Sequence, residues 1–198
     1  MQGPESEGFS SWADANGLAG EVGGTGGFPD APLEITAPGE ESGTYDAFLE
    51  LTGFEDFGVG RGLSEDEAAA MRPDYQASPD DNVILSAMEG TPSALGYAGF
   101  AFAEEGGDSI KEIAVDGGEG CISPSRETIA DGTYPLSRSL YIYVNTTAIA
   151  DNPALRAFTD YYVSDTGLLT AVPEVGYVEL PADRIDSTRA AWEAVSAG

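Results

Sequence analysis

Histidine is absent from this 198-residue sequence, and Cys121 is its only cysteine. Ser-His-Asp catalysis, Cys-His catalysis and zinc sites of the usual His/Cys type are therefore excluded within this chain. Basic residues are also scarce, because arginine and lysine together number 8 and Lys111 is the sole lysine. A lone cysteine between glycines and a Ser-Pro turn is most often a buried or incidental thiol. In an exported protein it can instead pair with a cysteine outside this chain.

The acidic residues dominate the charge. There are 35 of them, and the formal net charge at pH 7 is -27. A field of this sign repels DNA, RNA and anionic membrane surfaces, so nucleic acid is not an expected partner. An acid-rich surface poor in lysine is also typical of proteins that work at high salt. Any anion bound here must be held by local donors, while salt screens distant charges within about 10 Å.

The apolar content is sufficient for a real core, since 41% of the residues are hydrophobic and 10% are aromatic. We therefore expect one or two compact lobes and not a disordered chain. No run of about 20 apolar residues occurs, so no membrane-spanning helix is predicted. Residues 1–16 contain neither a basic region nor an apolar run, so no signal peptide is predicted in this chain. Residues 1–6 are expected to form a loop that leads to Ser10-Ser11-Trp12, and not a natural N-terminus.

The stretch over residues 33–49 combines a strand, a tight turn and the start of a helix. Apolar and polar residues alternate over 33–36, Pro38-Gly39 breaks the strand, and Ser42-Gly43-Thr44 opens a segment of helical periodicity. Such a junction places two hydroxyls and unpaired N–H groups at the positive end of a helix, which suits a small oxyanion. The alternative is an ordinary serine N-cap, which the local sequence by itself favours.

The stretch over residues 72–82 is the second informative one. Ser78 is predicted to cap a helix with Pro79 in its first position, and Asp80 and Asp81 complement the helix dipole. The spacing of these acids does not fit a calcium-binding EF-hand loop. Arg72 is one of few cations and precedes this helix, so it is a candidate anion ligand. The alternative for Arg72 is a surface ion pair.

Apolar periodicity divides the rest of the chain into short elements. Because strands and helices alternate, the predicted fold class is α/β with an open, mixed sheet. In the last predicted helix, Ile185, Trp192 and Val195 are expected to share one buried face. Further strands are expected at 94–100, 110–115 and 140–144, helices at 12–22, 64–71, 101–105, 123–130, 152–162, 166–171 and 181–196, and loops at 23–27 and 54–61.

Several spaced blocks, in this order, resemble a known family. They are Ser42-Gly43-Thr44 through Phe48, Arg72 to Tyr75 with Ser78 to Asn82, Ala94 to Phe100, and Tyr134 to Arg138 with Tyr141 to Val144. Together they resemble the PstS-type phosphate-binding proteins of phosphate ABC transporters, over roughly residues 30–180. The resemblance implies a type 2 periplasmic-binding-protein fold, in which two α/β lobes with open mixed sheets and flanking helices close on the ligand.

The resemblance also implies the site residues. In that family a Ser-Gly-Thr turn binds phosphate through hydroxyls and backbone amides, which corresponds here to Ser42, Gly43 and Thr44. The best-known members carry an arginine four residues before that serine, whereas this chain has Pro38. We therefore expect Arg72 to supply the cationic contact in its place. Arg138 is the second candidate, with a role at the hinge as its alternative.

The resemblance implies two segments with different roles. Residues 1–138 are expected to form most of the second, ligand-binding lobe, and residues 139–198 to return towards the hinge and the first lobe. The family's N-terminal half-lobe, which carries an aspartate that accepts a proton from hydrogen phosphate, is expected to be missing. Without that acceptor, discrimination against sulfate is expected to suffer. A cysteine in the missing part is one possible partner for Cys121.

The predicted function is a non-enzymatic receptor that captures inorganic phosphate outside the cytoplasm, in the periplasm or as a cell-surface lipoprotein. It would deliver phosphate to an ABC transporter permease and needs no cofactor or metal. One alternative is an interaction or structural module that retains the lobe without binding a ligand. A less favoured alternative is a serine hydrolase with Ser42 as the nucleophile, because the surrounding sequence is not a G-x-S-x-G elbow and no histidine base exists.

Overall fold

The computed structural model describes residues 3–196. The chain divides into two compact units, Met1–Lys111 and Glu112–Gly198, and each is described here by itself. The resemblance implies a boundary near residue 138 between the ligand-binding lobe and the segment that returns to the first lobe. This boundary stays a prediction. Within the described residues, no helix combines the length and the apolar character needed to cross a membrane.

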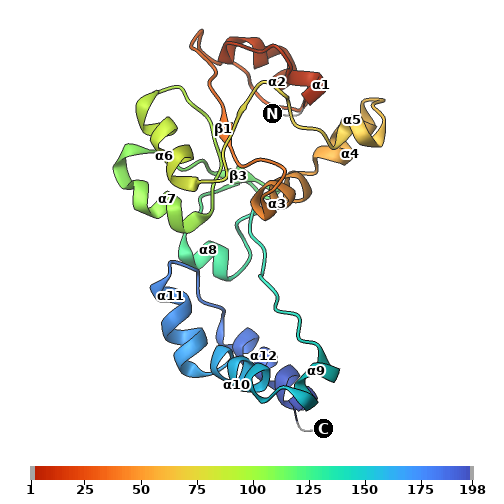
Figure 1. The fold of residues 1–198 in the computed structure, drawn as a ribbon. Helices are drawn as coiled ribbons and strands as arrows, with labels where there is room; N and C mark the ends of the chain where they lie inside the picture. Colours follow the sequence, from red (N-terminus) through yellow and green to blue (C-terminus); the bar gives the residue numbers. More distant parts are fainter. Residues whose placement is uncertain (1–2, 197–198) are drawn as a thin grey trace. The chain divides into compact units, whose positions relative to one another are not determined.

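The first unit is largely helical, with a small parallel sheet (Figure 1). Its elements before the sheet are α1 (Gly3–Ser6), the 3-10 helix η1 (Trp12–Ala15) and α2 (Asn16–Glu21). Strand β1 (Thr36–Ala37) leads to α3 (Gly43–Thr52), α4 (Phe54–Gly60) and α5 (Glu65–Ala68), and β2 (Gln76–Ala77) leads to α6 (Asp81–Gly90), α7 (Phe100–Gly106) and η2 (Gly107–Ser109).

Three chain segments run side by side in this unit. Strands β1 and β2 are parallel, with Thr36 opposite Gln76 and Ala37 opposite Ala77. On the other side of β1, a parallel bridge joins Ile35 to Leu95. The side chains of Ile35, Ala37 and Ile84 are buried beside them, and α6 packs against both β1 and α7. Because the three segments are parallel, their carboxyl ends lie at one edge.

The second unit has a short antiparallel pair and a helical core. Strands β3 (Val115–Asp116) and β4 (Cys121–Ile122) pair antiparallel, and α8 (Arg126–Ala130) follows. The helices are α9 (Thr146–Asp151), α10 (Pro153–Tyr162), the π-helix η3 (Gly167–Ala171), α11 (Val172–Glu174) and α12 (Ala182–Ser196). Ile149, Val163, Leu168, Ile185 and Trp192 form the core of this unit.

The sheet is smaller than the sequence predicts. Residues 140–144 form no strand, and of residues 94–100 only Leu95 makes a bridge. Within the described chain the fold therefore contains two two-stranded sheets and no open mixed sheet. The 110–115 strand is reduced to β3, which starts at its last residue. Strand pairing depends on distant partners, so an apolar alternating run does not by itself create a sheet.

Several helix predictions also need correction. The predicted loop over 54–61 is mostly helix α4. Asp80, not Ser78, caps α6: the Asp80 carboxylate accepts from the Asn82 N–H at 2.9 Å, while the Ser78 hydroxyl accepts from the Asp80 N–H at 3.2 Å. Helix α8 begins at Arg126, three residues after the predicted start at Ser123, because Ser125 caps it. Val195 is exposed, whereas Ile185 and Trp192 are buried as expected, and Cys121 is exposed.

Candidate functional site

The candidate site lies at the carboxyl edge of the small parallel sheet in the first unit. The chain leaves β1 through Pro38 to Glu41 and enters α3, and it leaves β2 through Ser78 to Asp80 and enters α6. The N-terminal ends of two ten-residue helices thus follow neighbouring parallel strands. Helix N-termini carry partial positive charge, and open α/β sheets bind their ligands beyond the carboxyl ends of the strands. This edge is therefore the natural place for an anion.

Ser42 acts as the N-cap of α3. Its backbone is extended, with φ -103° and ψ 129°, and its hydroxyl accepts a hydrogen bond from the Thr44 N–H at 3.1 Å. The Ser42 N–H donates to the Gly39 carbonyl oxygen at 3.0 Å, and the Tyr45 N–H donates to the Ser42 carbonyl oxygen at 2.9 Å. Ser42 is thus an ordinary helix cap, and an anion bound here would have to replace the Ser42 hydroxyl as the acceptor of the Thr44 N–H.

Thr44 is the partly exposed hydroxyl of this turn. Among residues 3–196 its hydroxyl has no hydrogen-bond partner, in contrast to the Ser42 hydroxyl. A free hydroxyl one residue into the helix adds a donor next to the capped N–H groups. Thr44 is therefore the member of the predicted turn that is best prepared to donate to a ligand.

Three tyrosines lie close to this edge. The Tyr75 hydroxyl donates to the Pro38 carbonyl oxygen at 3.0 Å, and the Tyr97 ring stacks on Phe48 with centroids 4.0 Å apart. Burial raises the pKa values of Tyr45, Tyr75 and Tyr97, and each of the last two is raised further by the tyrosine hydroxyls near it. The hydroxyls therefore stay protonated at neutral pH. Sequence analysis did not select these residues, because their approach depends on three separate segments.

Acidic side chains surround the same edge. Burial is the main cause of the raised pKa values of Tyr45 and Tyr75, and the negative charge of Glu40 raises both further. The Glu41 carboxylate folds over Gly39, where a Cβ would lie 2.4 Å from its Oε2. Burial, followed by the charge of Asp80, raises the pKa of Asp81. The field at the candidate site is thus negative, and an anion there depends on short-range donors.

Arg72 forms an ion pair, as the alternative predicts, but its side chain is buried and does not lie at the surface. Its Nε and Nη2 atoms donate to the two carboxylate oxygens of Asp74 at 2.6 and 2.7 Å, and Nη2 also donates to the Phe9 carbonyl oxygen at 2.7 Å. This pairing lowers the pKa of Asp74 to about 2. Nη1 is buried without a partner in the described part of the chain. These guanidinium contacts lie outside the 42–44 turn, so a phosphate-binding role for Arg72 stays a prediction.

Arg138 belongs to the second unit, where it is exposed. Its part in anion binding likewise stays a prediction. The Arg-x-Asp spacing of Arg72 and Asp74 was visible in the sequence and is the signal that indicates an ion pair. No comparable acidic neighbour follows Arg138 in the sequence.

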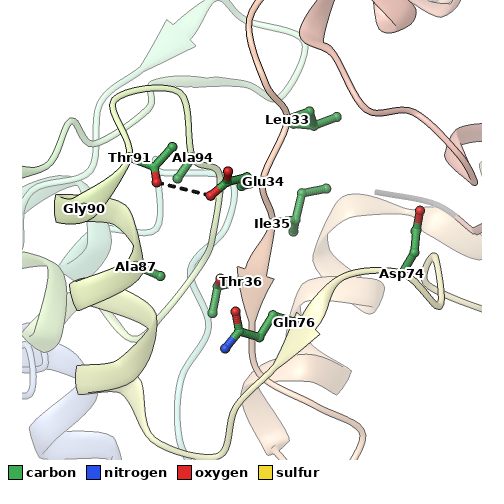
Figure 2. Close-up of a pocket in the computed structure, with 10 residues that line it drawn as sticks. All are labelled: Leu33, Glu34, Ile35, Thr36, Asp74, Gln76, Ala87, Gly90, Thr91 and Ala94. Atoms are coloured by element: carbon green, nitrogen blue, oxygen red, sulfur yellow. Dashed lines mark hydrogen bonds between the residues drawn. The ribbon is translucent and has the colours of Figure 1, made fainter.

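A separate cavity of about 440 Å³ lies beside β1 and the end of α6. Figure 2 shows Glu34, Asp74 and Gln76 among its lining residues, and the Thr91 hydroxyl donates to the Glu34 carboxylate at 3.2 Å. Neither Ser42 nor Thr44 lines this cavity. Within residues 3–196 no cluster of three or more Asp, Glu, Cys or His residues is arranged to hold a metal ion.

Comparison with known proteins agrees with this architecture. Residues 8–166 match a family described as a PBP superfamily domain. The chain is 41% identical over 157 residues to the SphX protein of Synechocystis, which covers 79% of this chain and 43% of SphX. It is 29% identical over 172 residues to the phosphate-binding protein PstS of Staphylococcus haemolyticus, which covers 86% of this chain and 46% of PstS.

A solved structure gives a longer match. The crystal structure of a possible phosphate binding protein from Planctomyces limnophilus superposes with a TM-score of 0.70 and 27% sequence identity, over 96% of this chain and 60% of that one. The chain spans less than half the length of the two curated relatives above. Because the family match extends over 8–166, the chain belongs to the PBP superfamily, where its relatives include PstS phosphate-binding proteins and SphX.

Proposed function

We propose that this chain is the phosphate-binding portion of an extracytoplasmic receptor that supplies an ABC transporter. Relatives named as phosphate-binding proteins support the ligand class. The observation that carries the site is the position of Ser42-Gly43-Thr44 at the start of α3, directly beyond the carboxyl end of β1. The receptor binds and releases phosphate unchanged, in the periplasm or at the cell surface, and a permease receives it.

Binding at this turn follows from the donors present. A phosphate oxygen accepts from the free Thr44 hydroxyl and from the first N–H groups of α3, in place of the Ser42 hydroxyl that now accepts from the Thr44 N–H. Hydrogen bonds to a charged acceptor are stronger than the neutral one that they replace. Arg72 is the proposed source of positive charge within the first unit, because the chain offers few others, and the role of Arg138 in the second unit stays a prediction.

A site-resolved titration tests this proposal. Amide shifts of the ¹⁵N-labelled chain are followed by NMR as inorganic phosphate is added, because NMR also detects weak binding. We expect saturable shifts concentrated at residues 42–46. Thr44→Val should weaken binding by about 10-fold or more, because one hydrogen bond to a charged group is worth about 1.5–3 kcal/mol. Thr52→Val, at the other end of α3, is the matched control and should leave the affinity unchanged.

The second candidate function is an interaction module that retains the lobe without a ligand. The internal capping by Ser42 and the acidic residues Glu40 and Glu41 favour it, because both oppose an anion at this turn. This candidate is supported if the chain is folded and the amide shifts of residues 42–46 do not change when millimolar phosphate or sulfate is added. Equal phosphate affinity in Thr44→Val and the unchanged chain would place binding elsewhere.

A further inference from the structure

A buried hydroxyl lies without a partner at the cavity beside β1. Thr36 is only 5% exposed, and within residues 3–196 its hydroxyl has no hydrogen-bond partner. A hydroxyl that is withdrawn from bulk water and left unpaired costs stability, so its presence in a folded chain requires an explanation. Because Thr36 lines the cavity of about 440 Å³, this unused donor and acceptor lies at the cavity wall (Figure 2).

Glu34 lies on the same side of the chain as Thr36. The two residues flank Ile35 in its parallel bridge with Leu95: the Leu95 N–H donates to the Glu34 carbonyl oxygen at 2.8 Å, and the Thr36 N–H donates to the Leu95 carbonyl oxygen at 3.1 Å. Side chains two residues apart in such a ladder point to one face. The Glu34 carboxylate accepts from the Thr91 hydroxyl through one oxygen, which leaves its other oxygen for a ligand.

Gln76 adds a third polar side chain to this face. It lies opposite Thr36 in the parallel pair of β1 and β2, and it lines the same cavity. In the part of the chain that the structure describes, the Gln76 side-chain amide has no hydrogen-bond partner. An amide offers two donors and an acceptor, so Thr36 and Gln76 together present uncommitted hydrogen-bonding groups of both kinds.

The end of α6 supplies acceptors on the opposite wall. Ala87 and Gly90 line the cavity, and α6 ends at Gly90. The next residue, Thr91, is extended with φ -135° and ψ 109°, and its N–H makes no capping hydrogen bond within the described residues. The last carbonyl groups of α6 are thus not capped, and this end of the helix dipole is negative. Both features favour a positively charged group with several donors.

We propose that this cavity binds a small organic cation, a molecule with one ammonium group and at least one neutral polar group. The ammonium group donates to the Glu34 carboxylate and to the last carbonyl groups of α6. The neutral group exchanges hydrogen bonds with the Thr36 hydroxyl and the Gln76 amide. The inference does not depend on phosphate binding, because neither Ser42 nor Thr44 lines the cavity.

The charge and the size of the cavity argue against other ligand classes. Asp74 also lines it, but both of its oxygens accept from the Arg72 guanidinium, so this pair adds no net charge. Among the described residues that line the cavity, Glu34 is then the one uncompensated charge, and it repels an anion. A calcium ion requires about six to eight oxygen ligands, whereas a cavity of this volume is in the range of small-molecule sites.

An NMR titration with 4-amino-1-butanol tests the proposal, and 1,4-butanediol is the matched neutral probe. The ¹⁵N-labelled 198-residue chain is titrated at about 0.15 M salt, where distant charges are screened beyond about 8 Å. We expect saturable amide shifts at residues 34–36, 76 and 87–91 with the amine, and affinity for the diol at least about 10-fold lower.

Three variants separate the cavity from the acidic surface. Glu34→Gln should weaken binding of the amine at least about 5-fold. Thr36→Val should weaken it about 3-fold or more without lowering the melting temperature, because the hydroxyl that it removes has no partner in the described chain. Glu105→Gln is the control, since Glu105 is exposed on α7 and does not line the cavity. It should leave the affinity unchanged.

Four outcomes would overturn the proposal. They are an absence of saturable shifts at the cavity, equal binding of the diol, unchanged affinity in both Glu34→Gln and Thr36→Val, and an equal loss of affinity in Glu34→Gln and Glu105→Gln. The last outcome would indicate diffuse attraction to an acidic surface. None of them bears on the phosphate titration, which follows the amides of residues 42–46.

Discussion

Gly96 and Thr36 approach each other so closely that no side chain fits between them. A Cβ on Gly96 would lie 2.4 Å from the Thr36 carbonyl oxygen and 2.9 Å from the Met88 Cε. This contact lies where the segment after Leu95 passes β1, and the Thr36 N–H donates to the Leu95 carbonyl oxygen at 3.1 Å. The absence of a side chain at position 96 therefore allows the third parallel segment to reach the sheet.

Gly96→Ala is expected to lower the free energy of unfolding by about 1–3 kcal/mol, because the added methyl group forces the backbone apart. Urea unfolding followed by circular dichroism measures the change. Gly90→Ala is the control, since a Cβ at Gly90 meets nothing within 4 Å. Gly90 also ends helix α6, so alanine there should leave stability unchanged or raise it slightly. Equal stability of the two variants would contradict the close contact at position 96.

Asp74 neutralises a buried guanidinium, and its removal is expected to destabilise the first unit. Asp74→Asn leaves Arg72 charged and buried with weaker partners, which should cost about 2–4 kcal/mol of the unfolding free energy. Asp165→Asn is the matched control, because Asp165 pairs with Arg189 at 2.7 Å but is largely exposed. Its loss should cost less than about 1 kcal/mol. Comparable losses for both variants would show that burial of Arg72 is not decisive.

The same ion pair predicts a dependence of stability on pH. The pKa of Asp74 in the folded chain is about 2, below the value of about 3.9 expected in the unfolded chain. A folded pKa that is lower than the unfolded one stabilises the fold above the unfolded pKa, and this stabilisation is lost as the pH falls. The stability difference between the unchanged chain and Asp74→Asn should therefore be full at pH 6 and shrink between about pH 4 and pH 2. Urea titrations across this range measure it, and a difference that grows as the pH falls has the wrong sign.

The helix starts were the most predictable part of the fold, because capping is local. Ser42 caps α3, which is the alternative that the local sequence favours, and the helices predicted at 64–71 and 152–162 begin as predicted, with Ser64 and Asn152 as their caps. The prediction that Ser78 caps α6 is wrong, because Asp80 does so. Both side chains form local hydrogen bonds, and only the three-dimensional path of the chain selects between them. Helix α4 was missed because its glycines suggest a loop, although Gly53 in the left-handed conformation precedes it and α4 packs on α5.

The sheet and the site were less predictable, because both depend on residues distant in the sequence. The apolar pattern of 140–144 is typical of a strand, yet a strand also needs a partner that the pattern does not supply. Likewise, the scarcity of cations directed attention to Arg72, while its burial against Phe9 follows from a contact across 63 residues. Tyr45, Tyr75 and Tyr97 meet only in the folded unit, so no local motif indicates them.

Salt should strengthen phosphate binding at the start of α3. The negative field of Glu40, Glu41 and Asp81 and the net charge of -27 repel the ligand over long distances, whereas the donors act in contact. Raising sodium chloride from about 20 to 200 mM shortens the screening length from about 20 to 7 Å and should tighten binding several-fold. The NMR titration with phosphate at the two salt concentrations measures this. An affinity that falls with salt would indicate a site dominated by arginine.

Ser42 and Thr44 should differ in what their substitution changes. Ser42→Ala removes the hydroxyl that accepts from the Thr44 N–H, so it should lower the unfolding free energy by about 1 kcal/mol. It also frees that N–H for a ligand, so the affinity for phosphate should fall less than in Thr44→Val. Thr44→Val removes a hydroxyl without a partner in the described chain and should leave stability within about 0.5 kcal/mol. Urea unfolding and the NMR titration of both variants distinguish the roles. If Thr44→Val lowers stability and Ser42→Ala does not, Thr44 has a structural role and Ser42 is not a cap.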